Sequence, residues 1–131
     1  MVTIYHNPKC GTSRNVLAMI RDSGVEPTVI DYQQMPPSRD TIRKLATDAG
    51  LTIRAAMRRK NTPYDALGLD DPALTDDQLL DAIEAHPILL ERPFVVTPRG
   101  TKLCRPSETV LDLLDNPPTE FTKEDGEVVR R

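Results

Sequence analysis

The sequence has few of the features that mark membrane, secreted or metal-binding proteins. Its 131 residues include only two cysteines, Cys10 and Cys104, too few for a disulfide framework or a four-ligand metal site. No apolar run approaches the roughly 20 residues that a membrane-spanning helix needs. Residues 1–6 lack the basic start and the long apolar segment of a signal peptide. We therefore expect a cytoplasmic protein with no membrane span and no bound metal.

Charge and composition limit the class further. The net charge is −3, whereas general nucleic-acid-binding proteins are usually basic, so we expect no nucleic-acid partner. Hydrophobic residues make up 38% and charged residues 28% of the chain, as in a globular protein rather than a disordered one. There is no internal repeat. The length predicts a single domain over residues 1–131, and we expect it to be a monomer.

Hydrophobic spacing predicts an α/β fold. Strands at 2–5 and 28–32 flank a helix at 11–21, an order that implies two parallel strands. The charged tail is expected to be a short helix or loosely held. The order predicts a thioredoxin-like fold, with a four-stranded mixed sheet flanked by helices and a helical insertion between the βαβ and ββα parts. The remaining predicted elements are helices at 38–49, 53–60 and 75–85, strands at 94–97 and 101–104, and a helix beginning at Pro106.

Cys10 lies where the first strand turns into the first helix. A helix start offers unpaired N–H groups and the positive end of its dipole, which favour both a thiolate and a docked oxyanion. Gly11 allows close backbone approach, and Thr12 and Ser13 add hydroxyl donors. Free cysteines are more often buried structural residues, but the polar turn after Pro8 argues against burial here. Cys10 is therefore the leading candidate for a nucleophile.

The motif from Cys10 to Ser13 is C-x-x-S, which lacks the second thiol of a C-x-x-C pair. A redox cycle at Cys10 would therefore need an external thiol. Cys104 ends a predicted strand and is better interpreted as a small buried apolar residue. His6 has two comparable interpretations: a donor or cation that helps to hold the thiolate, or a partly buried strand-end residue with a satisfied ring.

Three arginines form a second candidate group. Arg92 precedes Pro93 at the entrance of one predicted strand, Arg105 precedes Pro106 at the exit of the next, and Arg58 lies in the basic segment near residue 60. Guanidinium groups match tetrahedral oxyanions with paired hydrogen bonds. A lone arginine is usually a solvated surface residue, but two at strand ends strengthen the case for an anion site.

Three separated segments also carry a family resemblance. They are residues 6–14 (HNPKCGTSR), 92–97 (RPFVVT) and 103–108 (LCRPSE), with further similarity at 37–40, 64–68 and 121–126. Together they strongly resemble the glutaredoxin-coupled arsenate reductases, the ArsC family, which are small cytoplasmic enzymes of bacterial arsenic resistance. The resemblance covers nearly the whole chain, and the order of the motifs makes it specific.

The resemblance implies a reaction. Cys10 matches the family's nucleophile, which attacks arsenate and forms a covalent thioarsenate adduct. Glutathione then attacks the adduct, glutaredoxin reduces the mixed species, and arsenite is released. No bound cofactor is implied, since glutathione and glutaredoxin act as external reductants. The family's Arg-Pro bond at the position of Arg92 and Pro93 is expected to be cis.

The resemblance also implies roles for the other candidates. Arg58, Arg92 and Arg105 match the three arginines that hold the oxyanion. Arg59 lies next to Arg58 and is a second candidate for the first of these positions, but the resemblance favours Arg58. His6 and Ser13 match residues thought to support the thiolate.

Two alternatives remain open from the sequence. One is a related glutathione-dependent thiol reductase without arsenate activity, in which the arginines would bind another anion. The other is a Spx-like regulator that binds RNA polymerase through the basic segment at 53–60. That regulator family typically uses a C-x-x-C switch, and Ser13 replaces its second cysteine here.

Overall fold

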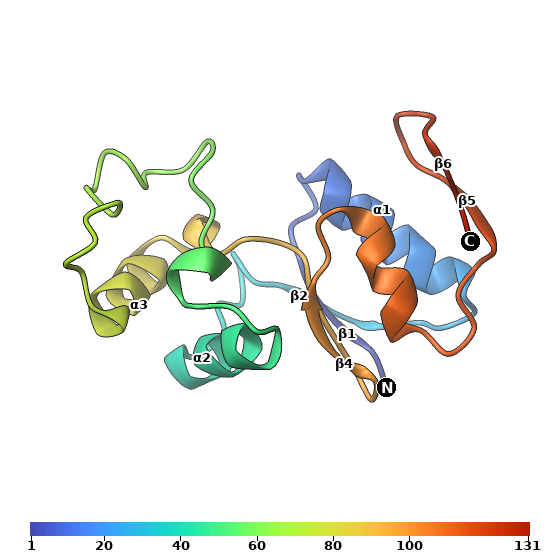
Figure 1. The fold of residues 1–131 in the computed structure, drawn as a ribbon, viewed down its shortest axis with the longest axis horizontal. Coiled ribbons are helices and arrows are strands. Elements are labelled where there is room, and N and C mark those ends of the chain that lie inside the picture. Colours follow the sequence, from blue (N-terminus) through green and yellow to red (C-terminus); the bar gives the residue numbers. More distant parts are fainter. The chain divides into compact units, whose positions relative to one another are not determined.

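A computed structural model describes all residues from 1 to 131 and divides the chain into two compact units (Figure 1). One unit combines Met1–Asp31 with Arg92–Arg131, and the other is the intervening segment Tyr32–Glu91. The expectation of a single domain over 1–131 stays a prediction.

The first unit is built on a four-stranded mixed sheet in the order β2-β1-β3-β4. β1 runs parallel to β2 and antiparallel to β3, and β3 and β4 form an antiparallel hairpin. The predicted α/β, thioredoxin-like sheet is thereby confirmed. The strands are β1 (Thr3–His6), β2 (Thr28–Asp31), β3 (Phe94–Thr97) and β4 (Gly100–Leu103).

The side-chain alternation of the strands explains this arrangement. On β1, Ile4 and His6 are buried while their neighbours are half-exposed, the period of two that a strand requires. The turn between β3 and β4 is shorter than predicted. Thr97 pairs directly with Gly100, whose φ of +139° is one that glycine adopts readily. β4 therefore begins one residue early, and Cys104 follows the strand instead of ending it.

Helix α1 (Gly11–Asp22) and the 3₁₀ helix η3 (Ser107–Leu113) lie side by side in this unit (Figure 1). The buried α1 residues recur at helical spacing, as the sequence predicts, and Gly24 follows its end with φ +89°. Pro106 is the N-cap of η3 and not its first residue. At 12 residues α1 is the longest helix, and none has the length and apolar character of a membrane span.

An apolar cluster stabilises the first unit. Each fully buried aliphatic side chain contributes about 1.5–3 kcal/mol to the free energy of unfolding. The cluster members come from β1, α1, β3, η3 and the segments beside them: Val2, Ile4, Val16, Met19, Ile20, Val95, Cys104, Val110, Leu111, Leu113 and Leu114.

The C-terminal tail differs from the prediction of a helix or a loosely held segment. It forms an antiparallel hairpin of β5 (Glu120–Thr122) and β6 (Val128–Arg130). Phe121 and Val129 are paired across the hairpin and pack on the apolar cluster. The partial burial of these two apolar side chains explains why a strongly charged segment is ordered.

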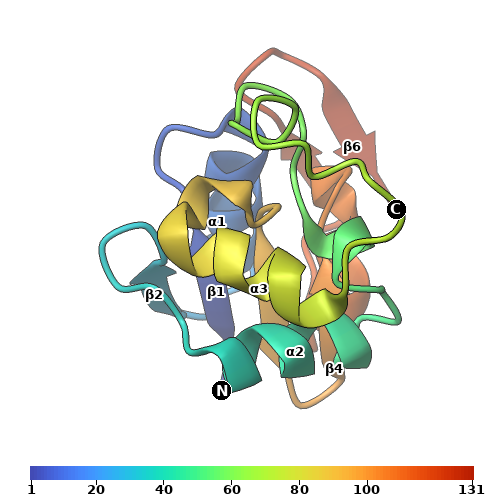
Figure 2. The ribbon, with the colours of Figure 1, turned by 90° about the vertical axis from the view of Figure 1, so that its left-hand side faces the viewer.

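The second unit contains α2 (Arg39–Asp48) and α3 (Asp76–Ala85), which lie next to each other (Figure 2). Both predicted N-caps are confirmed. The Ser38 hydroxyl accepts from the Thr41 N–H at 3.1 Å, and Thr75 and Gln78 form a reciprocal capping box.

The predicted helix at 53–60 is wrong beyond its first turn. Only the 3₁₀ turn η1 (Arg54–Ala56) forms, and Met57 then makes a β-bridge to Leu90, just after the second 3₁₀ turn η2 (Pro87–Leu89). The Arg58 N–H donates to the Leu89 carbonyl at 2.7 Å. Burial of Met57 in this bridge outweighs the helical propensity of the basic residues that follow.

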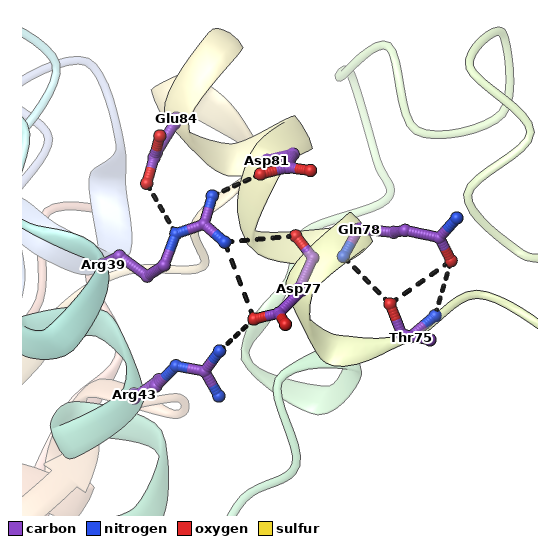
Figure 3. A network of polar contacts seen from close by, with 7 residues as sticks. All are labelled: Arg39, Arg43, Thr75, Asp77, Gln78, Asp81 and Glu84. Atoms are coloured by element: carbon purple, nitrogen blue, oxygen red, sulfur yellow. Dashed lines mark hydrogen bonds and ion pairs between the residues drawn. The ribbon is translucent and has the colours of Figure 1, made fainter.

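Charged side chains join α2 to α3 (Figure 3). Arg39 pairs with Glu84, at 2.8 Å between Nε and Oε1, and also with Asp77 and Asp81. Arg43 adds a second pair to Asp77. One guanidinium therefore meets carboxylates from three positions along α3, a network that joins the two helices.

We expect Arg39→Met to lower the melting temperature by about 2–4 °C, because one change removes several cross-helix ion pairs. The matched control is Lys44→Met, which removes only the local pair to Asp48 on α2. Thermal unfolding in low salt and in 1 M NaCl provides the measurement. The difference between the two variants should shrink in high salt, where charges are screened within about 3 Å. Equal melting temperatures at low salt would contradict a bridging role.

Candidate active site

Cys10 occupies the N-cap of α1, directly after the turn that follows β1. Its N–H donates to the Asn7 carbonyl and its own carbonyl accepts from the Arg14 N–H, both at 3.0 Å. The side chain is half-buried, and the first turn of α1 contains no acidic residue. Gly11 and Thr12 are the first two residues of that turn. The thiol therefore faces a helix start whose positive end is not neutralised by its own helix.

A buried serine fixes this turn from behind. The Ser13 hydroxyl, which is wholly buried, accepts from the Asn7 N–H at 3.1 Å and lies 2.6 Å from Nδ1 of His6. Burial lowers the pKa of His6 and so favours the neutral ring, although Asp31 opposes the effect. In a neutral ring, Nδ1 can accept a hydrogen bond from the serine hydroxyl. The structure thus connects His6 to the Cys10 turn through Ser13.

Two of the three predicted arginines lie at the thiol. Nη1 of Arg105 is 3.7 Å from Sγ of Cys10, and it also donates to the Arg92 carbonyl at 3.0 Å. Arg92 is itself buried. Both Arg-Pro peptide bonds that follow these arginines are cis, one of them at the expected position.

These neighbours set the ionisation of Cys10. Partial burial alone would raise the pKa of the thiol. The Ser13 backbone N–H and the guanidinium groups of Arg105 and Arg92 favour the thiolate and outweigh burial, so the pKa of Cys10 lies below its ordinary value. Arg14 is a further nearby cation that the sequence did not single out.

Arg58 belongs to the other unit, Tyr32–Glu91. There its Nη1 lies 3.0 Å from Oε1 of Glu91, and its Nε donates to the Lys60 carbonyl at 3.1 Å. The Arg58 side chain is only 14% exposed, whereas that of Arg59 is 60% exposed and pairs with Asp65. A role for Arg58 at the thiol stays a prediction.

Cys104 has the opposite environment. It is fully buried in the apolar cluster, and burial raises the pKa of its thiol to about 12. The structure confirms its interpretation as a small core residue. A protonated thiol in this position is a poor nucleophile.

An open, groove-like cavity of about 810 Å³ lies between α1 and the C-terminal hairpin. Its lining includes His6, Arg14, Leu17 and Phe121, but not Cys10, Arg92 or Arg105. We therefore place the candidate active site at the thiol and not in this cavity. The side chains at the thiol supply a nucleophile, backbone N–H donors and guanidinium groups, which together suit attack on a tetrahedral oxyanion.

Comparison with known proteins adds independent information. A family model described as the ArsC family matches residues 5–113. An arsenate reductase of Rhizobium meliloti (strain 1021) is 60% identical over 129 residues, which are 98% of this chain and 92% of that protein. An arsenate reductase of Escherichia coli is 61% identical with the same coverage. The solved structure of an arsenate reductase from Vibrio cholerae has a TM-score of 0.82 at 44% identity, covering 86% of this chain and 97% of its own.

The geometry predicts how Cys10 reacts with alkylating agents. Arg105→Met should raise the pKa of Cys10 and slow its alkylation by iodoacetamide about three- to tenfold at pH 7, because a charge-assisted contact to the thiolate is lost. Arg99→Met, which removes an exposed arginine of the β3–β4 turn, is the control. The pH profile of alkylation, followed by mass spectrometry, provides the measurement. An unchanged profile in Arg105→Met would contradict the proposed contact.

Proposed function

The chain belongs to the ArsC family, and we propose that it reduces arsenate to arsenite through a covalent adduct on Cys10, with glutathione and glutaredoxin as reductants. The observation that carries the proposal is the Cys10 thiol at the start of α1, within 3.7 Å of the Arg105 guanidinium. We propose that it acts in the cytoplasm, where such thiols are kept reduced. The reaction requires no bound metal or organic cofactor.

The first step is substitution at arsenic. Arsenate is a tetrahedral oxyanion, so the helix start and the guanidinium groups of Arg92 and Arg105 suit it as ligands. The Cys10 thiolate forms a sulfur–arsenic bond and one arsenate oxygen leaves as water. Arsenic is still As(V) after this step. The low pKa of Cys10 matters here because the thiolate, and not the thiol, is the nucleophile.

The following steps bring in two electrons from outside the chain. Glutathione replaces a second oxygen, which leaves as water, and becomes bonded to arsenic through its sulfur. A glutaredoxin thiol then attacks that glutathione sulfur. A disulfide forms, the sulfur–arsenic electron pair stays on arsenic, and As(III) remains on Cys10. Water finally displaces the Cys10 thiol and releases arsenite.

The thiol inventory of the chain supports an external source of electrons. Ser13 replaces the second cysteine of a C-x-x-C pair, and its hydroxyl is already engaged with Asn7 and His6. Cys104 is buried with a raised pKa. Cys10 is thus the one accessible thiol, and a two-electron reduction needs a partner for it.

A coupled assay tests the proposal. Purified protein with arsenate, glutathione, glutaredoxin and NADPH-linked glutathione reductase should consume NADPH only when arsenate is present. Cys10→Ser should abolish this consumption. Full turnover in Cys10→Ser, or no arsenate-dependent turnover by the wild-type protein, would overturn the assignment. Turnover that survives without glutaredoxin would overturn only the proposed role of glutaredoxin.

The arginines give a finer prediction. Arg92→Ala and Arg105→Ala should each lower kcat/KM for arsenate about tenfold or more, because each removes a charged hydrogen-bond donor. Arg58→Ala should lower it as well if Arg58 also binds the oxyanion, whereas its neighbour Arg59→Ala should remain within about twofold of wild type. Steady-state kinetics with arsenate as the varied substrate provide the measurement. Equal effects of Arg58→Ala and Arg59→Ala would remove Arg58 from the site.

A further inference from the structure

The turn of the C-terminal hairpin contacts both chain segments that meet at the thiol. This turn joins β5 to β6 and is closed by two backbone hydrogen bonds, from Lys123 N–H to the Glu127 carbonyl at 2.8 Å and from Gly126 N–H to the Lys123 carbonyl at 2.9 Å. Gly126 has φ +91°, which suits glycine. The backbone of the turn is therefore a defined structure.

One set of contacts reaches the start of α1. The Glu124 carboxylate accepts three hydrogen bonds from Arg14: Nε donates at 2.9 Å and 3.1 Å, and Nη2 donates at 3.0 Å. The Glu124 N–H donates to the side-chain carbonyl of Asn15 at 3.0 Å. Nη1 of the same arginine donates to the Pro8 carbonyl at 2.9 Å. The hairpin turn is thus bonded directly to the segment after Cys10 and, through Arg14, to the segment before it.

A second contact reaches the start of η3. Nζ of Lys123 lies 2.9 Å from Oε1 of Glu108, and the Lys123 side chain is only 10% exposed. Glu108 is in the first turn of η3, three residues after Arg105. Adjacent residues of one turn therefore bind both the helix start that presents Cys10 and the helix start that follows Arg105.

We propose that Lys123 and Glu124 are positioning residues, which hold the starts of α1 and η3 together so that the Arg105 guanidinium stays at the Cys10 thiolate. The proposal rests on the proposed function only in taking Cys10 as the nucleophile. It concerns a part of the chain that contributes no group to the reaction itself.

The energetic argument favours an effect on the site over an effect on stability. Exposed ion pairs contribute little to the free energy of unfolding, about 0–1 kcal/mol, and Arg14 and Glu124 are 44% and 48% exposed. The contact between Arg105 and Cys10 depends much more steeply on placement, because displacement by about 1 Å removes much of a hydrogen bond or a catalytic alignment. Losing the Glu124 contacts should therefore change the thiol more than the melting temperature. Lys123 is much less exposed, but it also lies 3.3 Å from Glu127 and so keeps one partner when Glu108 is removed.

The test compares Glu124→Met and Glu108→Met with Glu120→Met as the matched control. Glu120 pairs with Arg130 at 3.2 Å, an exposed ion pair of the same hairpin between its strands and away from the turn. All three changes remove one negative charge and keep a side chain of similar length. The pH profile of Cys10 alkylation, assigned by mass spectrometry, and thermal unfolding are measured for each variant. Neither measurement uses arsenate, so failure here is distinguishable from failure of the proposed function.

The direction of the change in the pKa of Cys10 distinguishes a positioning role from a simple charge effect. Positioning predicts that Glu124→Met and Glu108→Met both raise the pKa of Cys10 and slow alkylation about threefold or more at pH 7, with the control unchanged. If these glutamates acted only as negative charges, their removal would favour the thiolate and lower the pKa. A lower pKa, an unchanged pKa with a lower melting temperature, or a rise in only one variant would each overturn the proposal.

Discussion

The hydrogen bonds of the Ser13 hydroxyl are the constraint on which the site depends. A buried hydroxyl must be satisfied, and here it accepts from Asn7 and bonds the ring of His6. These contacts fix the turn between β1 and α1, and with it the direction in which the helix N–H groups point. Ser13 thus positions Cys10 at the helix start, although the Ser13 side chain itself is buried behind the turn.

The two cysteines show how far surroundings control thiol chemistry. Both belong to the same unit, and neither is in a disulfide. Cys10 meets a backbone N–H and two guanidinium groups, and these favour the thiolate. Cys104 meets apolar side chains, which favour the protonated form up to a pKa of about 12. Only one of the two thiols is therefore suited to attack at neutral pH.

Local patterns in the sequence predict much of the fold and the residue types that lie at the thiol. A short β-type run at 2–5 predicts β1 to within one residue, helical spacing predicts α1, and the capping residues Ser38 and Thr75 predict the starts of α2 and α3. The position of Cys10 at a strand–helix junction follows from the same patterns. Each of these features depends on residues within a few positions of one another, which is the range over which such patterns act.

The features that the sequence did not reveal depend on distant partners. Met57 leaves the helical conformation because it pairs with Leu90, and the tail is ordered because Phe121 packs on the apolar cluster. The hairpin does have a local signal, Asp125-Gly126, but its strands are only three residues long, too short for apolar alternation to identify them.

The contact between Arg14 and Glu124 spans 110 positions of sequence, and that between Arg105 and Cys10 spans 95. No local pattern encodes such a separation, so the residue types at the thiol could be predicted while the segments that hold them together could not. The residues close to Cys10 in sequence thus determine the chemistry of the site. Its geometry depends on contacts between segments near the two ends of the chain. A substitution in the tail can therefore act on the thiol without touching it.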